Sequence, residues 1–357
     1  MPEKDPIDPR LPAAQKLRRR LRYRGTHPRT YEEKYKELDP ERDPETIAKV
    51  LASGKTPAGQ HRPILVEEIM EHLVPQPGER GADVTFGYGG HSEVLLEKIM
   101  PVGQLLALDV DAVQLPRSEA RLRTLGHDEN TLIVRRSNFA GLAGVLGKIE
   151  WHDGVDFVLA DLGLSSMQID NPARGFSYKH DGPLDMRMNP ERGAPARDLL
   201  ARCKVEKLTR ILSEGGDEPR AEIIAEAIVE GAAHAPIENT RHLRRIVDGA
   251  LPLHLKEDVR AATISRVFQA IRIAVNDEFS ALDAFLANLP NCLKPGGRVA
   301  ILSFHSGEDR RVKLHFREGF RSGIYREISP DIIRPTPEEV GSNPRASSAK
   351  MRWAIRA

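Results

Sequence analysis

A glycine-rich turn and an acidic residue about 20 positions later are the first candidates for a chemical role. Residues 83–92 read DVTFGYGGHS, a strand-like segment that runs into Gly87, Gly89 and Gly90 and then into a helix-like segment. Glycines at such a turn allow a backbone to approach a ligand closely. The next strand-like segment, LLALDVD, places Asp109 at its carboxyl end, where a carboxylate can bind both hydroxyls of a ribose. Together the two features predict a nucleoside site, although glycine turns without a ligand are common.

The spacing of the glycines bears on which nucleoside is bound. The pyrophosphate fingerprint of dinucleotide-binding proteins has glycines at its first, third and sixth positions, whereas here the three glycines are followed by the letters HSE. The sequence therefore disfavours NAD, and it contains no phosphate loop in which Lys precedes Ser or Thr. The two cysteines, Cys203 and Cys292, are far apart, so we expect no disulfide framework, no metal site and no radical cluster.

The elements that must position these residues alternate between strand-like and helix-like patterns from residue 61 to residue 305. We expect strands at residues 82–86, 105–109, 131–135, 155–162 and 298–304. Helix-like segments such as residues 92–100 and 140–148 lie between the early strands. This alternation predicts an α/β fold in which helices cover a parallel sheet.

A long stretch separates the fourth expected strand from the fifth. Residues 166–251 carry a proline-rich loop and then apolar residues at helical spacing, such as Leu208, Ile211 and Leu212. We expect an inserted helical subdomain here, which divides the main domain into residues 61–165 and 252–357. Residues 1–60 are rich in charge and proline and are expected to form a partly disordered extension. Within it, residues 43–54 could form a short helix, and the basic run 16–24 could hold RNA phosphates or form a solvated face.

The bulk composition describes an ordinary folded protein. The chain has 357 residues, of which 40% are hydrophobic and 29% charged, and this length suits one large domain with an insertion. Its 53 basic and 52 acidic residues indicate no partner by themselves. The N-terminus carries no apolar core segment, and no run of about 18 apolar residues occurs. We therefore expect a cytoplasmic protein that does not contact a membrane.

Six long motifs, taken in order, resemble a single family. They are DVTFGYGGHS at Asp83, DLGLSSMQID at Asp161, RGFSYKHDGPLDMRM at Arg174, FQAIRIAVNDE at Phe268, LKPGGRVAILSFHSGEDR at Leu293 and NPRASSAK at Asn343. On these motifs the chain resembles the RsmH (MraW) family of ribosomal RNA small-subunit cytosine-N4 methyltransferases. The resemblance implies a Rossmann-like class I methyltransferase fold and S-adenosyl-L-methionine as cofactor. It also implies N4-methylation of a cytosine in the decoding region of 16S rRNA within the small ribosomal subunit, with the insertion as the part that recognises the substrate.

The resemblance assigns the methyl-donor site residue by residue. It implies a cofactor-binding set made of Gly89, Gly90, His91, Asp109, Phe139, Asp161 and Gln168. In this set Asp109 would bind the ribose and Phe139 would stack near the adenine. Without the resemblance, Phe139 could equally be a core aromatic residue, and Gln168 would be read as a solvated loop residue.

Three residues are candidates for catalysis at the acceptor base: Asp161, Asp185 and His305. The lone pair of cytosine N4 is delocalised into the ring, so an acceptor for the amino hydrogens at a strand end would orient it, and no metal is required. Many amino-methyltransferases follow the acid with two prolines and an aromatic residue, but here Leu162, Gly163 and Leu164 follow Asp161. For Asp185 and His305 the alternatives are a loop-bracing carboxylate and a satisfied buried histidine.

Several questions stay open at the level of sequence. RNA phosphates could be held by four basic residues, which could also be merely solvated: Arg174, Lys179, Arg187 and Arg192. The chain departs from the family pattern at Val110, at Gly307 and in the EGGDEPR segment at residues 214–220. An NAD-dependent small-molecule dehydrogenase and a nucleoside-binding ribosome-assembly factor without turnover are the alternative functions. The oligomeric state is open, with a homodimer as one alternative.

Overall fold

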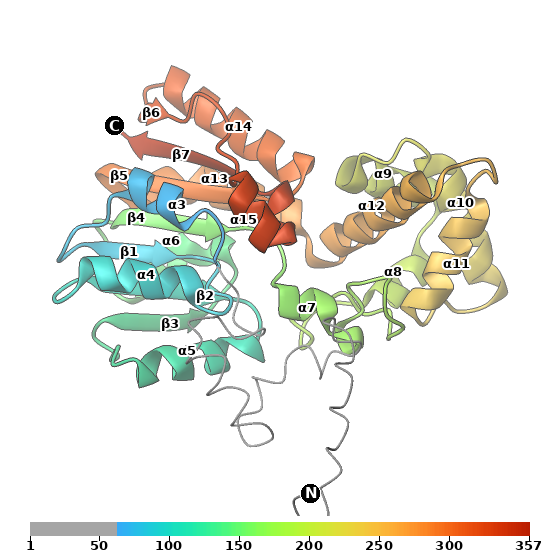
Figure 1. Cartoon of the computed structure of the whole chain (residues 1–357), viewed down its shortest axis with the longest axis horizontal. Coiled ribbons are helices and arrows are strands. Elements are labelled where there is room, and N and C mark those ends of the chain that lie inside the picture. The colour runs from blue at the N-terminus through green and yellow to red at the C-terminus, as the bar shows by residue number, and fades with distance from the viewer. Residues whose placement is uncertain (1–62) are drawn as a thin grey trace, which may run out of the picture.

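The structure of the protein is a computed structural model that describes residues 63–357. Figure 1 shows a sheet covered by helices, with a separate group of helices beyond the carboxyl ends of its parallel strands. The expected helix at residues 43–54 and the basic run at residues 16–24 lie outside the described residues.

Within residues 63–357, seven strands form one sheet in the order β3-β2-β1-β4-β5-β7-β6. The strands are β1 (Arg80–Asp83), β2 (Gln104–Asp109), β3 (Leu132–Arg136), β4 (Val155–Asp161), β5 (Leu293–Ser303), β6 (Tyr325–Ile328) and β7 (Lys350–Arg356). β1 to β5 pair in parallel, whereas β7 runs antiparallel to both β5 and β6. The strand order reverses between β1 and β4, and ligands bind at such a switch point in open α/β sheets.

The central strands are apolar along almost their whole length because helices cover both faces of the sheet. In β2, Leu105 and Ala107 pack into one core cluster, and Leu106 and Leu108 pack into the other. All four side chains are fully buried, and a leucine buried in this way contributes about 1.5–3 kcal/mol of transfer free energy. The near-continuous apolar runs seen in the sequence therefore mark the centre of the sheet.

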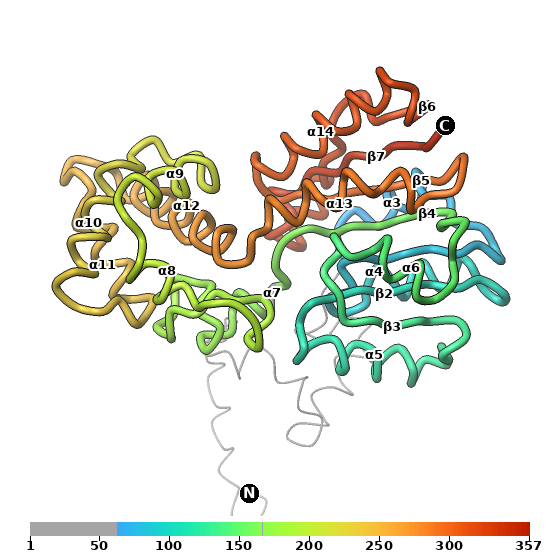
Figure 2. The backbone as a smooth tube through the Cα atoms, turned by 180° about the vertical axis from the view of Figure 1, so that it is seen from behind, coloured from blue at the N-terminus to red at the C-terminus, as the bar shows by residue number. Residues whose placement is uncertain are grey.

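Three helices cover each face of the sheet. The first face carries α3 (Val66–Leu73), α4 (Gly90–Ile99) and α5 (Gln114–Thr124), whose apolar side chains share a cluster with alternate residues of the strands. The opposite face carries α6 (Leu142–Lys148), α13 (Glu278–Cys292) and α14 (Ser306–Arg321). The three-layer arrangement of the main domain is visible from both sides (Figures 1 and 2).

A second group of helices, which we call the helical layer, has a core of its own. It consists of α8 (Ala196–Arg202), α9 (Val205–Gly216), α10 (Ala221–His234), α11 (Thr240–Ala250) and α12 (Glu257–Asn276). At Gly216, at the end of α9, a Cβ would lie 2.7 Å from the Arg266 carbonyl oxygen of α12, so this glycine permits the close crossing of the two helices. The short helix α7 (Ser166–Asp170) follows β4 on the way to this layer (Figure 1).

The expectation of an α/β fold with a parallel sheet is confirmed, and each of the five expected strands overlaps an observed one. β6 and β7 were not predicted; they add an antiparallel edge to the sheet. The first strand ends at Asp83 rather than at Phe86, because the chain then bends into the glycine turn. α12 packs its residues Val267, Phe268 and Ile271 into the helical layer, although it follows residue 251, the expected end of the insertion. Among the described residues, no helix is long and apolar enough to cross a membrane.

Candidate active site

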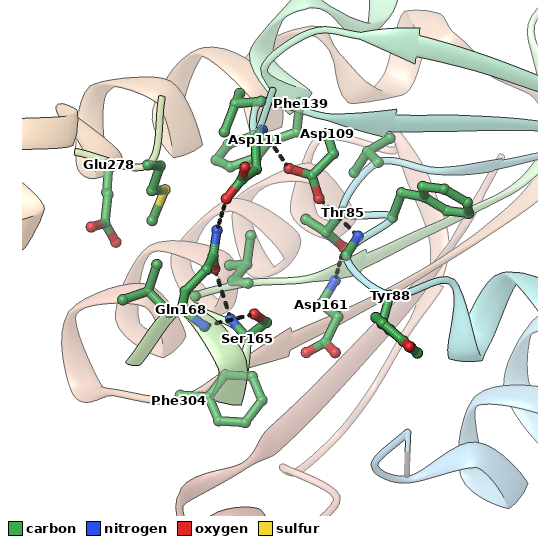
Figure 3. Close-up of a pocket in the computed structure, with 18 of the residues that line it drawn as sticks. Thr85, Tyr88, Asp109, Asp111, Phe139, Asp161, Ser165, Gln168, Glu278 and Phe304 are labelled. Atoms are coloured by element: carbon green, nitrogen blue, oxygen red, sulfur yellow. Dashed lines mark hydrogen bonds between the residues drawn. The ribbon is translucent and has the colours of Figure 1, made fainter. Parts of the chain in front are cut away.

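A cavity of about 410 Å³ lies at the carboxyl ends of the parallel strands. Its walls come from the segments that follow β1, β2, β3, β4 and β5, from the end of α12 and the start of α13, and from residues 63–64 and 343–348. The volume is within the range of small-molecule sites, and the position is the switch point between β1 and β4. Figure 3 shows part of this lining, with acidic residues on more than one strand end.

The glycine-rich turn connects β1 to α4 and holds Asp109 in place. The Gly87 N–H donates to Asp109 Oδ2 at 2.8 Å, with Gly87 at a positive φ of 50°. Gly89 is the N-cap of α4 with φ 80°, and a Cβ there would lie 3.1 Å from the Phe86 ring. Gly90 and His91 line the cavity, but Gly89 is not among the lining residues. Gly89 therefore allows the sharp turn of the chain into α4.

Asp109 lies at the cavity end of β2 with both carboxylate oxygens oriented by the backbone. Oδ2 accepts from Gly87 and Oδ1 accepts from the Asp111 N–H, each at 2.8 Å. Burial raises the pKa of Asp109 to about 6, against the lowering effect of these two bonds. A carboxylate oxygen has two acceptor positions, so each oxygen keeps one for a hydroxyl group. This geometry fits the ribose-binding role implied by the resemblance.

Phe139, which follows β3, belongs both to the core and to the wall of the cavity. Its ring packs edge-on against Phe285 of α13, with centroids 5.6 Å apart, and the residue also lines the cavity. The two interpretations left open by the sequence are therefore compatible for this residue.

Gln168 and Arg174 converge on Asp111, which sequence reasoning did not single out. Asp111 is 1% exposed, and its Oδ2 accepts from Gln168 Nε2 at 2.7 Å and from Arg174 Nη1 at 2.9 Å. Gln168 Oε1 in turn accepts from the Ser165 N–H at 3.0 Å (Figure 3). Burial would raise the pKa of Asp111, but Arg174 and Gln168 hold that pKa below its usual range. Gln168 lines the cavity, yet its Nε2 ties the loop after β4 to the end of β2, and its Oε1 accepts a hydrogen bond from within that same loop.

Asp161 ends β4 with one carboxylate oxygen that has no hydrogen-bond partner. Its N–H donates to Thr85 Oγ1 at 2.6 Å, its Oδ2 lies 3.6 Å from His91 Nδ1, and its Oδ1 is buried and unpartnered. His91 Nε2 lies 2.9 Å from the Ile64 carbonyl oxygen, which can only accept, so Nε2 carries a hydrogen. Burial raises the pKa of Asp161 to about 6, while His91 acts to lower it. The carboxylate is therefore a base that can take up a proton near neutral pH.

Phe304 and His305 follow the end of β5. The carboxylate of Glu308, in the first turn of α14, contacts the backbone of Phe304 and the ring of His305. Glu308 Oε2 accepts from the Phe304 N–H at 2.9 Å, and Glu308 Oε1 lies 3.1 Å from His305 Nε2. All three residues line the cavity. Burial would raise the pKa of Glu308, but His305, Arg272 and the Phe304 N–H hold that pKa below its usual range.

Glu278, His305 and Glu308 also form a group whose ligand atoms all lie within 4.8 Å of one another. Carboxylate oxygens and imidazole nitrogens are ligands for ions such as Zn²⁺. However, Arg272 donates from Nε and Nη2 to the two oxygens of Glu278, each at 2.8 Å. A metal ion at this place would have to compete with the guanidinium group.

One of the three residues expected at the acceptor base, and two of the basic residues expected at RNA phosphates, have other contacts. Asp185 is not among the cavity-lining residues; its carboxylate binds the side chain of Arg187 at 2.7 and 2.8 Å, which matches the loop-bracing alternative. Arg174 is engaged internally, with Asp111 and with the carbonyl oxygens of Arg187 and Met188. Lys179 and Arg192 are exposed. Of the four basic residues considered for phosphate contacts, Arg174 and Arg187 therefore already have protein partners.

Sequence reasoning missed several residues of the site. Asp111, Phe304 and Glu308 each lie within two or three residues of a predicted site residue. Their positions just after the ends of β2 and β5 were the available signal, because the carboxyl ends of parallel strands meet at one edge of the sheet. Thr85 gave no such signal, since its hydroxyl acts on a residue 76 positions later in the chain.

The chain is similar to known proteins over most of its length. The model of the MraW methylase family matches residues 58–357. The chain is 49% identical to ribosomal RNA small subunit methyltransferase H 2 of Alkaliphilus metalliredigens, over 96% of this chain and 99% of the relative. It is 48% identical to ribosomal RNA small subunit methyltransferase H 1 of Lachnoclostridium phytofermentans, over 87% of this chain and 86% of the relative. Among solved structures, a SAM-dependent O-methyltransferase of Thermotoga maritima matches with TM-score 0.38 and 12% identity, over 88% of this chain and 72% of that chain.

Proposed function

The chain belongs to the MraW methylase family, and on that premise we propose that it methylates the N4 amine of a cytosine in the decoding region of 16S ribosomal RNA. The observation that carries the proposal is that Asp109 and Asp161 line one cavity, from strands on either side of the switch point. The names of the relatives support a small-subunit ribosomal RNA substrate. The family favours methyl transfer over the dehydrogenase alternative.

The residues on the β2 side of the cavity fit S-adenosylmethionine as methyl donor. Asp109 keeps acceptor positions for two ribose hydroxyls, and Phe139 offers an aromatic wall at the next strand end. Glycine residues bring the backbone of the turn to the same wall. When bound, S-adenosylmethionine supplies the methyl group as an electrophile on a sulfonium centre. The carboxylates around the cavity favour a ligand with that positive charge.

The residues on the β4 side fit the chemistry of an amine acceptor. As N4 forms its bond to the methyl group and the bond from sulfur to methyl breaks, N4 must lose one proton. The unpartnered Oδ1 of Asp161 can accept an amino hydrogen beforehand and take up the proton afterwards. A pKa of about 6 leaves the Asp161 carboxylate mostly ionised at pH 7.

The substrate that we propose is an assembled or partly assembled small subunit. The described residues present exposed basic side chains such as Lys179 and Arg192 in the segment that joins α7 to α8, and contacts of such side chains with phosphates recognise shape and charge rather than base sequence. A folded ribonucleoprotein surface offers many such contacts at once. The target base would have to be unstacked to enter the cavity.

The test compares methyl incorporation from labelled S-adenosylmethionine into purified small subunits, deproteinised 16S RNA and a short hairpin. All three are measured at one ionic strength, because salt alone changes such binding steeply. We expect transfer chiefly to the subunits, with N4-methylcytidine as the nucleoside found by mass spectrometry. Equal rates on the three substrates would refute the assembled-subunit proposal. Donor binding without any transfer would instead favour an assembly factor without turnover.

A further inference from the structure

Two buried hydrogen-bond acceptors in the cavity have no partner, and they lie at or just beyond the ends of the neighbouring strands β4 and β5. Within residues 63–357, the buried side-chain atoms without a hydrogen bond are Asp161 Oδ1, the two ring nitrogens of His305 and single nitrogens of three arginines. Arginine nitrogens only donate, so the acceptors in this set belong to Asp161 and His305 alone. Unpartnered buried acceptors are rare and costly in folded proteins. Here both line the same cavity, which suggests a ligand that donates to each.

The order of the strands places these acceptors away from the expected donor nucleoside. β5 is next to β4, whereas β2 is separated from β5 by β1 and β4. Neighbouring strands are about 4.8 Å apart, so the ends of β2 and β5 are separated by about 14 Å. Asp161 lies between them, one strand from His305. Figure 3 likewise shows Phe304 on the Asp161 side of the pocket, away from Asp109 and Phe139.

The side chains at the end of β5 are held in a defined arrangement. Glu308 is 4% exposed, accepts from the Phe304 N–H and faces His305 Nε2. An ionised carboxylate 3.1 Å from Nε2 favours the tautomer with its hydrogen on Nε2, which leaves Nδ1 as an acceptor. The His305 side chain is 8% exposed, so its rotation is restricted.

Gly307 leaves room beside that acceptor. A Cβ at position 307 would lie 3.3 Å from His305 Nδ1 and 2.6 Å from Cζ of Phe279. Any other residue would therefore displace Phe279 and crowd Nδ1. Gly307 is one of the positions at which the chain departs from the family pattern, and the consequence of that departure is open space beside His305 Nδ1.

We propose that the end of β5 is the subsite for the acceptor base, in which Phe304 stacks on the target pyrimidine and His305 Nδ1 accepts one hydrogen of its exocyclic amine. Asp161 Oδ1 accepts the other hydrogen, so the amine is held by both of its hydrogens with its lone pair directed out of the base plane. During transfer the bond from N4 to the methyl carbon forms, the bond from sulfur to that carbon breaks, and the N4 proton on the Asp161 side passes to the carboxylate. Glu308 is a positioning residue that acts through Phe304 and His305.

This inference rests on the proposed function, and substitutions at Phe304 test it. Loss of base stacking on an aromatic residue lowers affinity by about 5- to 150-fold per base. Phe304→Leu should therefore lower kcat/KM for small subunits within that range, while the Kd for S-adenosylmethionine changes less than about twofold. Phe320→Leu is the matched control, because Phe320 is 50% exposed on α14 and does not line the cavity. Unchanged kcat/KM, or a parallel loss of donor affinity, would overturn the assignment of Phe304.

Substitutions at His305 and Glu308 test the hydrogen-bonding part. His305→Asn places an amide oxygen near the position of Nδ1 and should retain much more activity than His305→Leu. Glu308→Gln keeps the size of the side chain but removes the charge that orients His305, so kcat should fall while donor affinity is kept. Equal activity of the two His305 variants would overturn the role of Nδ1.

A binding measurement separates this inference from the proposed function. Phe304→Trp keeps an aromatic platform and reports stacking through its fluorescence, with the two native tryptophans of the unmodified protein as background. With S-adenosylhomocysteine bound, added cytidine 5′-monophosphate should quench the new tryptophan, whether or not methyl transfer is detected. If the wild-type protein methylates subunits but no quenching occurs, the subsite is wrong and the function stands. If quenching occurs without methyl transfer to any RNA, the subsite stands and the function is wrong.

Discussion

Replacement of Asp161 by asparagine tests the proposed proton acceptor while the other residues of the site are left unchanged. The backbone bond from Asp161 to Thr85 does not involve the carboxylate, and Oδ1 has no protein partner to lose. The asparagine side chain has nearly the same shape, so the fold and the donor site should be preserved. The variant loses only the negative charge and the ability to accept a proton.

The expected magnitude follows from the role and from the pKa. A positioned general base contributes about 10²- to 10⁴-fold to the rate, so kcat of Asp161→Asn should fall within that range. With pKa values of about 6 for both Asp161 and Asp109, each carboxylate is about 90% ionised at pH 7 and about 10% at pH 5. In the roles proposed for them, both must be ionised to bind and use the donor, so kcat/KM for the donor should fall about a hundredfold from pH 7 to pH 5.

The midpoint of the pH profile should differ between the free enzyme and the enzyme with bound donor. Burial raises the pKa of Asp161, and the nearby Asp83 and Glu308 also raise it, while His91 lowers it. A bound sulfonium adds a positive charge that lowers the pKa further. The midpoint in kcat should therefore lie below the midpoint in kcat/KM, and activity should be lost as pH falls, not as it rises.

The assay is steady-state methylation of small subunits between pH 5 and 8, with donor affinity measured by calorimetry at each pH. In Asp161→Asn, the pH dependence of kcat/KM should become shallower, because only Asp109 still titrates. Asp153→Asn, in the exposed turn before β4, is the matched control and should behave as wild type. A variant at Asp161 that keeps a third or more of kcat, or a wild-type profile that is flat between pH 5 and 7, would refute the reasoning.

Three further predictions follow from the contacts around the cavity. Asp109→Ala should weaken S-adenosylmethionine binding by about 1.5–3 kcal/mol, the range for hydrogen bonds to charged groups, and an unchanged calorimetric Kd would contradict its assignment. Arg174→Met leaves Asp111 buried without its ion pair and should lower the free energy of unfolding by about 3 kcal/mol in denaturant titrations. The exposed Arg192→Met should change it by less than about 0.5 kcal/mol, and similar values for both variants would argue against the internal role of Arg174. Elemental analysis of the purified protein should find no stoichiometric zinc or manganese, because Arg272 occupies both oxygens of Glu278; one bound equivalent would contradict this.

The strand ends were the most predictable part of the site. Asp109 was identified from its place after an apolar run and Asp161 from the family resemblance, and both line the cavity at strand ends. This worked because a strand buried on both faces is an unbroken apolar segment, so its end is visible in the sequence. The same signal failed for β6, an edge strand whose two middle residues are exposed, and for β7, whose buried stretch is interrupted by Arg352 and is therefore not a continuous apolar run.

Single polar side chains in loops were the least predictable part. Asp185 and Arg174 belong to one motif, yet Asp185 pairs with Arg187 while Arg174 reaches Asp111, 63 residues earlier in the chain. Whether a charged loop residue faces solvent, a ligand or a distant partner depends on contacts that its neighbours in sequence do not specify. Gln168 illustrates the same limit, because its amide is used to fasten a loop.

The sequence by itself determined the α/β class, the family and the strand-end acids, because each depends on local patterns: apolar periodicity, turn residues and the order of motifs. Only the tertiary structure decided which acceptors were left without partners. Asp161 Oδ1 and His305 are brought to one cavity by strands about 140 residues apart, and Asp111 is bound by Gln168, 57 residues later in the chain. Hydrogen bonds and burial are properties of the surroundings of a side chain, and those surroundings exist only after the sheet and the helical layer have packed together.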